Sequence, residues 1–341
     1  MPDSILVTLV IPMRNEEAFI VPCLESLLAN DEPGTVELLV YDGESTDRSP
    51  ELVRALALGH PQVQLFPNPQ RLQAAAFNQA LQRARGRYFL RADAHSVYPN
   101  NYIGECLRLL EATGAENVGG LQRAEGNSWV TRAIAAGVSS RFAAGDAKYR
   151  HATTPAFTDT VYLGAWHTTT LRRLGGMRED LAVNEDYELN VRLRAAGGRV
   201  YLSPTIQSTY FVRGSLSKLA RQYLRYGFWK VRTLLEHPGS LRWRQLAAPS
   251  LVASLVATWP LVRWLGWLGA GLLGLYLVAN LAASIHLASR TAWRNLPLLP
   301  VIFAIVHCAW GLGFWAGIPY WLTRVTPRPT RVSEPAPPGS S

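Results

Sequence analysis

The sequence contains little cysteine and, in its last third, hardly any acid. Its 341 residues include three cysteines, Cys23, Cys106 and Cys308, whose number and wide spacing indicate neither a disulfide framework nor a zinc cluster. A reducing, cytosolic setting fits this composition. The first residues also lack a basic segment ahead of an apolar run, so we expect no cleavable signal peptide.

The charge is positive overall and uneven along the chain. There are 34 Lys and Arg residues against 25 Asp and Glu, a formal net charge of +9, which suits an anionic partner such as nucleic acid, anionic lipid or a sugar nucleotide. Zinc-finger spacing, an isolated basic arm and a helix-turn-helix pattern are missing, so we expect no nucleic acid. Acids are frequent up to Glu188 and almost vanish after Glu236. This change indicates a soluble part followed by a membrane part.

The soluble part alternates apolar strands with helices. Strands are predicted at residues 5–11, 36–41, 63–66 and 87–92, and helices at 18–29, 45–58, 70–84 and 100–112. This alternation predicts a parallel, three-layer α/β sheet with right-handed crossovers. Such sheets bind ligands beyond the carboxyl ends of their strands. The polar residues that follow the first four strands are therefore predicted to line one crevice: Arg14, Asn15, Asp42, Arg71 and Asp93.

The rest of the soluble part is less regular. Residues 117–120 resemble a strand and turn, and 141–164 read as a long irregular loop, a kind of segment that is often functional. A helix is predicted over 184–194 and a strand over 200–202. Residues 216–235 form a basic, aromatic helix that suits a membrane interface or the roof of an anionic pocket.

Three apolar segments follow, at about 246–262, 264–288 and 297–322. The second and third each reach the roughly 20 residues that cross a bilayer. The first is shorter and holds two prolines, so a tight hairpin and a re-entrant segment both remain open. We expect a multi-pass protein of the inner cell membrane, with two to three spans and its soluble part in the cytoplasm. The predicted division is 1–215, 216–240, 241–325 and a disordered tail at 326–341.

Two acidic stretches carry the strongest chemical signal. Asp93 and His95 are one residue apart, so in an extended segment both side chains can point to one face and share a cation. Carboxylate oxygen suits Mg²⁺ or Mn²⁺, and imidazole favours Mn²⁺. A solvated turn aspartate is the alternative. Asp186 lies beside Glu185 at a predicted helix start, where helix capping is the alternative to a chemical role.

Four motifs together resemble those of the family 2 glycosyltransferases. They are Ile11-Pro12-Met13-Arg14-Asn15-Glu16-Glu17, Asp42-Gly43-Glu44-Ser45-Thr46-Asp47, Arg91-Ala92-Asp93-Ala94-His95 and Asn184-Glu185-Asp186. They occur in the family's order and at similar separations, and the resemblance covers about residues 5–230. Within the family, the chain is most similar to the succinoglycan-type exopolysaccharide glycosyltransferases. That similarity rests on Asp93-Ala94-His95, Leu163-Gly164-Ala165, Asp186-Tyr187-Glu188-Leu189-Asn190 and the hydrophobic C-terminus.

The resemblance implies a GT-A fold and a nucleotide-sugar donor, usually a UDP-sugar, with inversion at the anomeric carbon. It implies that Asp93 binds the ribose or the metal on the diphosphate, and that Asp186 is the catalytic base. His95 stands where the family's Asp-x-Asp motif has its second acid. The residues expected to hold the donor in the crevice are Pro12, Arg14, Asn15, Glu16, Asp42, Arg71 and Asp93.

Residues Gln222, Arg225 and Tyr226 match the family's Gln-x-x-Arg-Trp element, with Tyr in place of Trp. Their spacing puts them on one helix face. The resemblance implies that Arg225 pairs with the diphosphate and that Tyr226 stacks on an acceptor sugar. An ordinary amphipathic helix is the alternative.

We therefore expect an inverting hexosyltransferase, with glucose as the best candidate sugar, that needs Mn²⁺ or Mg²⁺. It would transfer from a UDP-sugar to a lipid-linked saccharide during exopolysaccharide assembly. One alternative is an inert GT-A module that binds nucleotide or glycan as a membrane scaffold. Another is a transporter, which the scarcity of ionisable residues in the apolar segments disfavours, His286 and His307 being exceptions.

Overall fold

The computed structural model describes residues 5–30, 35–145, 147–212, 214–242, 244–258 and 262–324, so the predicted tail at 326–341 lies outside it. Within these ranges nine strands form one sheet in the order β3-β2-β1-β4-β8-β6-β9-β5, with β7 paired to β9 beside this path. The strands are β1 (Ile5–Met13), β2 (Thr35–Asp42), β3 (Val63–Pro67), β4 (Tyr88–Arg91), β5 (Ser96–Val97), β6 (Asn117–Glu125), β7 (Ala156–Thr158), β8 (Tyr162–His167) and β9 (Val200–Phe211).

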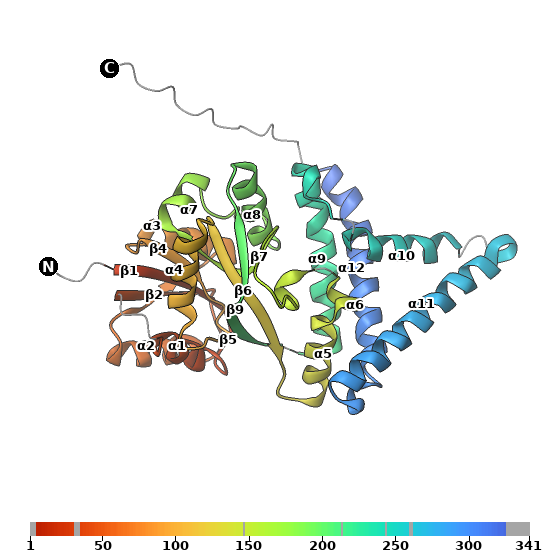
Figure 1. The fold of residues 1–341 in the computed structure, drawn as a ribbon, viewed down its shortest axis with the longest axis horizontal. Coiled ribbons are helices and arrows are strands. Elements are labelled where there is room, and N and C mark those ends of the chain that lie inside the picture. The colour runs from red at the N-terminus through yellow and green to blue at the C-terminus, as the bar shows by residue number, and fades with distance from the viewer. Residues whose placement is uncertain are drawn as a thin grey trace, which may run out of the picture.

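Helices cover the sheet and then continue beyond it. Those of the sheet-containing body are α1 (Ile20–Leu28), α2 (Ser49–Gly59), α3 (Gln73–Arg83), α4 (Tyr102–Thr113), α5 (Trp129–Ser139), α6 (Arg141–Ala144), η1 (Lys148–Arg150), α7 (Thr168–Leu174) and α8 (Glu185–Ala195). The C-terminal ones are α9 (Leu216–Glu236), η2 (Pro238–Ser240), α10 (Arg244–Thr258), α11 (Val262–Arg290), η3 (Trp293–Asn295) and α12 (Leu299–Leu322). Figure 1 shows α9 and α12 side by side against the body, with α10 and α11 extending away from it.

The first four strands are parallel, as the alternation of elements predicts. β1 pairs with β2 and β4, and β2 pairs with β3. On one face of the sheet Leu9 belongs to a buried cluster with Ile103 of α4. On the other face the Phe77 ring of α3 packs edge-on against Phe89 and Trp166. Apolar layers on both faces exclude water from these strands, which explains their unbroken apolar sequences.

The second half of the sheet is mixed and contains a strand that the sequence pattern conceals. β8 runs antiparallel to both β4 and β6, while β6 and β9 are parallel. The predicted irregular loop at 141–164 is therefore wrong where α6, η1, β7 and the start of β8 lie. Leu163 and Gly164 have φ angles of 59° and 151°, and a Cβ on Gly164 would lie 2.3 Å from the Trp166 ring. Only glycine fits here, and the kinked backbone disturbs the usual strand alternation.

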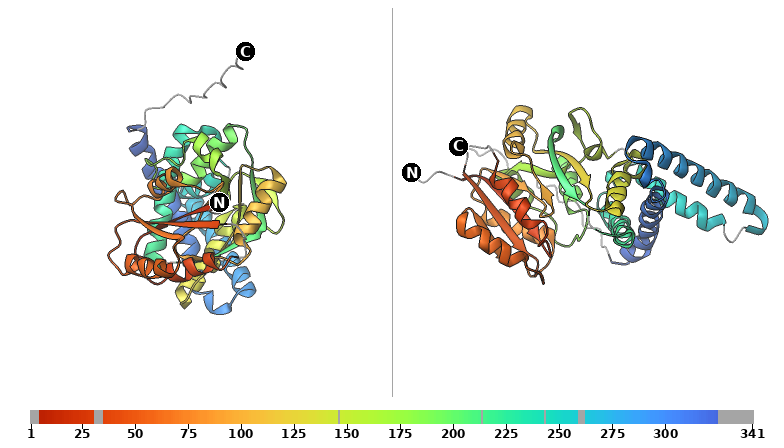
Figure 2. Two further views of the ribbon diagram at one scale, coloured as in Figure 1. Left: turned by 90° about the vertical axis from the view of Figure 1, so that its left-hand side faces the viewer. Right: turned by 90° about the horizontal axis from the view of Figure 1, so that it is seen from below.

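The apolar C-terminal helices pack in different ways. α12 lies along α9 and also contacts α5, α6, α10 and α11. α11 contacts α10, α12 and η3 more sparsely, and it projects from the body in perpendicular views (Figures 1 and 2). By length and composition α11 and α12 are the described helices able to cross a membrane.

Candidate functional site

The loops that follow β1 and β2 are fixed to one another by hydrogen bonds. The Asn15 backbone N–H donates to Ser45 Oγ at 2.9 Å, and the Glu16 N–H donates to Ser49 Oγ at 2.7 Å. α2 begins at Ser49, later than the predicted start at 45, because the preceding residues belong to this paired loop. Asn15 is exposed and Glu16 is buried.

Other predicted donor residues surround the same loops. Asp42 ends β2 and accepts hydrogen bonds from the Ser45 N–H at 3.2 Å and the Ser45 hydroxyl at 2.6 Å. Arg71, beyond β3, pairs with Glu44 through Nε at 2.7 Å. Asp42 also lines a shallow hollow with Phe66. Of the remaining predicted residues, Arg14 is exposed and Pro12 is half-buried. The structure thus brings the ends of the first three strands together.

Strained backbone concentrates at this end of the sheet. Within the described ranges, non-glycine residues with positive φ are Asn15 (55°), Glu44 (56°), Arg71 (56°), Leu163 (59°) and Asn184 (68°). Asn15, Glu44 and Arg71 lie in the loops just described, and Asn184 directly precedes α8. Such conformations cost of order 1 kcal/mol each and cluster at functional sites. Their distribution therefore marks this end of the sheet independently of the motifs.

Asp93 lies just beyond β4 and is held from three directions. Its Oδ2 accepts from the Tyr162 hydroxyl at 2.9 Å, and its Oδ1 accepts from Arg91 Nη2 at 3.2 Å. Its backbone N–H donates to the Tyr98 hydroxyl oxygen at 2.7 Å. Burial alone would raise the pKa of Asp93, but Arg91, His95 and Tyr162 outweigh burial and lower it. Asp93 is therefore a carboxylate at neutral pH.

The His95 ring contacts Glu16 and Tyr210. Its Nδ1 lies 3.2 Å from Glu16 Oε1, and the ring packs edge-on against Tyr210. Burial lowers the pKa of His95 below its ordinary value, although Asp93 opposes this effect. Across the part of the chain that the structure describes, no three His, Cys, Asp or Glu side chains are grouped so as to hold a metal. A cation at Asp93 would need further ligands from a bound substrate.

A buried ion pair between Arg91 and Glu185 was not foreseen from the sequence. Arg91 Nη1 lies 3.6 Å from Glu185 Oε1, and Arg91 Nη2 donates to Asp93 and to Gln73 Oε1. Arg91, Asp93 and Glu185 are only 7%, 8% and 6% exposed. The guanidinium therefore ties the end of β4 to the start of α8. The sequence feature that indicates such a pair is an arginine inside an apolar strand, since a buried charge requires a partner.

Glu185 and Asp186 open α8. Asp186 is half-buried, and its Oδ1 accepts from the Tyr187 N–H at 2.7 Å. The N-cap position belongs to Asn184, so Asp186 does not cap the helix. Burial and the neighbouring Asp186 charge raise the pKa of Glu185 to about 7, against the opposing effect of Arg91. Adjacent carboxyl groups of this kind can accept a proton from a substrate hydroxyl.

α9 brings part of the Gln222 element to the same region. Gln222 Nε2 donates to the Tyr226 hydroxyl at 2.6 Å. Burial raises the pKa of Tyr210, and a hydrogen bond with Gln222 partly offsets the rise. Because Tyr210 packs on His95, Gln222 reaches the His95 side of the site. Arg225 is exposed on the same helix.

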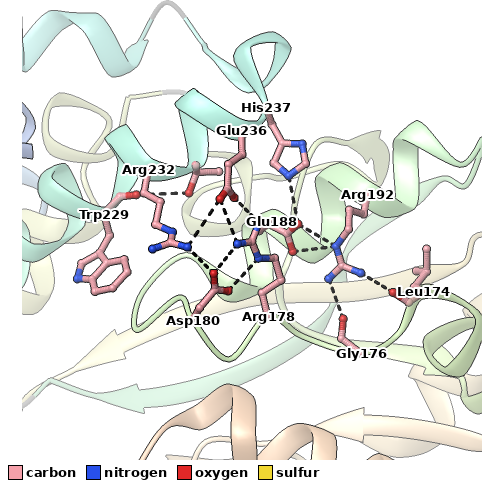
Figure 3. Close-up of polar contacts among 11 residues, drawn as sticks. Leu174, Gly176, Arg178, Asp180, Glu188, Arg192, Trp229, Arg232, Glu236 and His237 are labelled. Carbon is pink, nitrogen blue, oxygen red and sulfur yellow. Dashed lines mark hydrogen bonds and ion pairs between the residues drawn. The ribbon is translucent and has the colours of Figure 1, made fainter. Parts of the chain in front are cut away.

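An ion cluster connects α8 to the end of α9 (Figure 3). Its charged members are Arg178, Asp180, Glu188, Arg192, Arg232, Glu236 and His237. Glu188 Oε1 accepts from Arg192 Nε at 2.8 Å and lies 3.1 Å from His237 Nε2. Burial would raise the pKa of Glu188, but these two partners lower it below its ordinary value. The helix that carries Asp186 is therefore fixed to α9.

Comparison with known proteins places the chain among glycosyltransferases. Residues 8–172 match the model of glycosyl transferase family 2. The chain is 31% identical to the succinoglycan biosynthesis protein ExoA of Rhizobium meliloti, over 90% of this chain and 93% of that protein. It is 25% identical to the dolichyl N-acetyl-alpha-D-glucosaminyl phosphate 3-beta-D-2,3-diacetamido-2,3-dideoxy-beta-D-glucuronosyltransferase of Methanococcus voltae, over 92% and 97%.

Among solved structures, the mannosyltransferase PcManGT from Pyrobaculum calidifontis in complex with GDP-Man and Mn²⁺ matches with a TM-score of 0.59. The match covers 93% of this chain and 91% of that one at 21% identity. The mostly parallel sheet, flanked by helices and followed by apolar helices, is thus a GT-A fold. The chain belongs to glycosyl transferase family 2 and is similar to the succinoglycan-type members, which confirms the resemblance stated from its motifs.

Proposed function

We propose that the protein is an inverting glycosyltransferase that moves a hexose, with glucose as the best candidate, from a UDP-sugar to a lipid-linked saccharide. The observation that carries the proposal is the buried bridge from Asp93 through Arg91 to Glu185. This bridge holds a donor-side carboxylate beside the carboxyl pair that opens α8. Donor and acceptor would meet between the Asp93 carboxylate and this carboxyl pair.

In the proposed donor site, the loops after the first three strands hold the nucleoside and diphosphate. The position agrees with ligand binding beyond the carboxyl ends of parallel strands. Asp42 would accept hydrogen bonds from the base or ribose, and Arg71 would offset diphosphate charge. Arg225 exposes a second guanidinium on α9. Gln222 and Tyr226 would complete the wall on that side, and the remaining proposed donor contacts are Pro12, Arg14, Asn15 and Glu16.

We assign Asp93 as a ligand of a divalent cation, Mn²⁺ or Mg²⁺. Its carboxylate is ionised and buried, and its hard oxygen suits either ion. His95 is a second candidate ligand, although its Nδ1 is engaged with Glu16 and would have to leave that carboxylate. The fold relative named in complex with Mn²⁺ supports the choice of a divalent ion. When bound, such an ion offsets the negative charge that gathers on the leaving diphosphate.

Asp186 is the proposed base. A sugar hydroxyl is a poor nucleophile at neutral pH, so Asp186 would take its proton as the oxygen bonds to the anomeric carbon. The bond from that carbon to the diphosphate breaks, and UDP leaves with the electron pair. Glu185 is engaged with Arg91 and is not free to act as a nucleophile. A single displacement with inversion follows.

The acceptor and pathway are proposed from the relatives. One is named for succinoglycan biosynthesis and another for transfer to a dolichyl-linked sugar phosphate. The first supports a role in exopolysaccharide assembly, and the second supports a lipid-linked saccharide as the acceptor. Two long apolar helices in this chain would keep the site near such a lipid. We propose the inner membrane, with the catalytic domain in the cytoplasm.

The first test is Asp186→Asn. The variant should lose transfer about 10²- to 10⁴-fold, the usual contribution of a general base, while retaining UDP binding. Release of UDP is measured with purified protein, lipid acceptor and Mn²⁺, and UDP binding is measured by equilibrium dialysis. Glu51→Gln, at an exposed carboxylate on α2, serves as the matched control and should behave as wild type. Normal turnover by Asp186→Asn would refute the role of the base.

The same assay separates the enzyme from an inert scaffold. Wild-type protein is supplied with UDP-, GDP- and dTDP-sugars, with and without Mn²⁺. An enzyme of the proposed kind releases nucleotide most rapidly from one UDP-hexose and only with the ion present. Background release from every donor would favour the scaffold.

A further inference from the structure

α12 contacts the catalytic body along its whole length. Near its start, Ile302 and Val306 share a buried cluster with Ala133 and Ile134 of α5. Near its end, Trp321 Nε1 donates to the Phe228 carbonyl of α9 at 2.9 Å. Figure 1 shows α12 running beside α9 between these two points.

The contact between α9 and α12 is made at backbone distance. A Cβ on Gly313 would lie 2.0 Å from the Leu224 carbonyl oxygen, and one on Gly227 would lie 2.0 Å from the Trp310 carbonyl oxygen. α9 is itself fixed to α8 by the pairing of His237 with Glu188, and to the segment before α8 through Arg232 and Glu236 (Figure 3). The catalytic body and α12 must therefore take up one common orientation relative to a membrane.

A membrane-crossing α12 would carry charged groups into the bilayer. If it stood across the roughly 30 Å hydrocarbon layer, the adjoining stretch of α9 would lie at the same depth. That stretch bears Lys218 and Arg221 on its exposed surface. Each such charge inside a bilayer costs several kcal/mol. A packing that places α12 along the surface avoids this cost.

The surface of α12 supports the same placement. One side of the helix packs on α5 and α9, whereas Leu312, Trp315 and Leu322 are exposed by 51%, 45% and 60%. A half-buried helix with an apolar outer face suits the boundary between head groups and acyl chains. The neighbouring exposed cations of α9 suit anionic head groups.

α11 has the opposite character. Its window of greatest hydropathy is only 11% buried, against 39% for α12. Large side chains such as Trp267, Leu275 and Val278 are exposed by 74%, 68% and 67%. The sequence carries no charge between Arg263 and Arg290. Its 29 residues span about 43 Å at 1.5 Å per residue, enough to cross the bilayer when tilted. In Figures 1 and 2 it projects with α10 away from the body.

We propose that only the α10–α11 hairpin enters the lipid bilayer, and that α12 lies along its surface beside α9 on the catalytic side. This inference rests on the membrane location in the proposed function. With α12 on the surface, α8 and α9 would be held at the depth of the lipid head groups. The phosphate of a lipid-linked acceptor would meet Asp186 without leaving the membrane surface.

Cysteine labelling tests this topology. In full-length protein with Cys308→Ser, and with the other two cysteines buried, Thr291→Cys marks the end of α11 and Arg324→Cys the end of α12. Sealed spheroplasts and inside-out vesicles are treated with a membrane-impermeant maleimide, and Glu51→Cys reports the catalytic side. We expect all three positions to react from the same side.

Reaction of Arg324→Cys from the face opposite to Thr291→Cys would show that α12 crosses, and would overturn the proposal. Recovery of the unmodified protein in the soluble fraction would overturn it as well. Labelling needs no catalysis, so an inactive protein with the expected labelling would contradict only the proposed reaction.

Discussion

At the scale of single residues, Arg91 is a buried cation shared by two buried carboxylates. Burial lowers the pKa of Arg91, but Asp93 and Glu185 outweigh burial and raise it, so the guanidinium stays charged. Removing one member of a buried ion pair costs about 3–5 kcal/mol, because the partner keeps an uncompensated charge. Lysine lacks the planar fork that serves two acids at once. The position therefore requires arginine.

The raised pKa of Glu185 leads to a prediction about stability. Burial moves this pKa from 4.5 to about 7. As the pH rises between these two pKa values, ionisation of Glu185 lowers the free energy of unfolding. Above the higher value the loss is constant. Glu185→Gln removes that loss. Removing the Arg91 partner costs the variant stability at every pH, but its stability relative to wild type should rise by up to about 3 kcal/mol between about pH 5 and about pH 8.

Thermal unfolding of both proteins across this pH range checks the gain. Glu51→Gln changes an exposed carboxylate, and its difference from wild type should not vary with pH. A pH-independent difference for Glu185→Gln as well would contradict the raised pKa.

At the scale of elements, the glycine contact between α9 and α12 has a matched control on α11. Gly313→Ala would place a methyl group 2.0 Å from the Leu224 carbonyl oxygen, whereas Gly271 has nothing within 4 Å of its Cβ position. Both changes improve helix propensity by about 1 kcal/mol, but overpacking at Gly313 costs about 1–3 kcal/mol. Gly313→Ala should therefore lower the thermal midpoint relative to Gly271→Ala.

Transfer activity should fall with the same variant, because α9 carries Gln222 and Tyr226 toward the site. Equal thermal midpoints and equal activities in the two alanine variants would show that the close contact does not position α9.

At the scale of the whole molecule, α12 completes the core of the catalytic body. Ile302 and Val306 of α12 cover Ala133, Ile134 and Leu219, which belong to α5 and α9. A chain that ends after residue 241 would expose this apolar cluster to water, at about 25 cal/mol for each Å² uncovered. We expect it to aggregate even though it lacks the projecting hairpin. A soluble, monodisperse fragment with the wild-type thermal midpoint would contradict this expectation, as judged by size-exclusion chromatography beside the full chain in detergent.

Much of the GT-A body is predictable from local patterns. The apolar runs at 5–11 and 36–41 become the parallel strands β1 and β2, because an unbroken apolar run is stable only when both faces are covered. The acids that follow them lie at one edge of the sheet because parallel strands end on the same side. The strand β8 was not predicted, because Leu163 and Gly164 have φ angles that disturb the strand pattern.

The sequence by itself determined the alternation of strands and helices, the acids at the strand ends and the uncharged runs near the C-terminus, because each depends on neighbouring residues. Tertiary structure alone decided that Arg91 joins Asp93 to Glu185, since these partners come from separate elements. It also decided that α12 packs along α9. An uncharged run of 24 residues has the same sequence pattern whether it faces lipid or packs on protein, because both surroundings exclude water. Only the tertiary contacts distinguish a helix in lipid from a helix packed on the body.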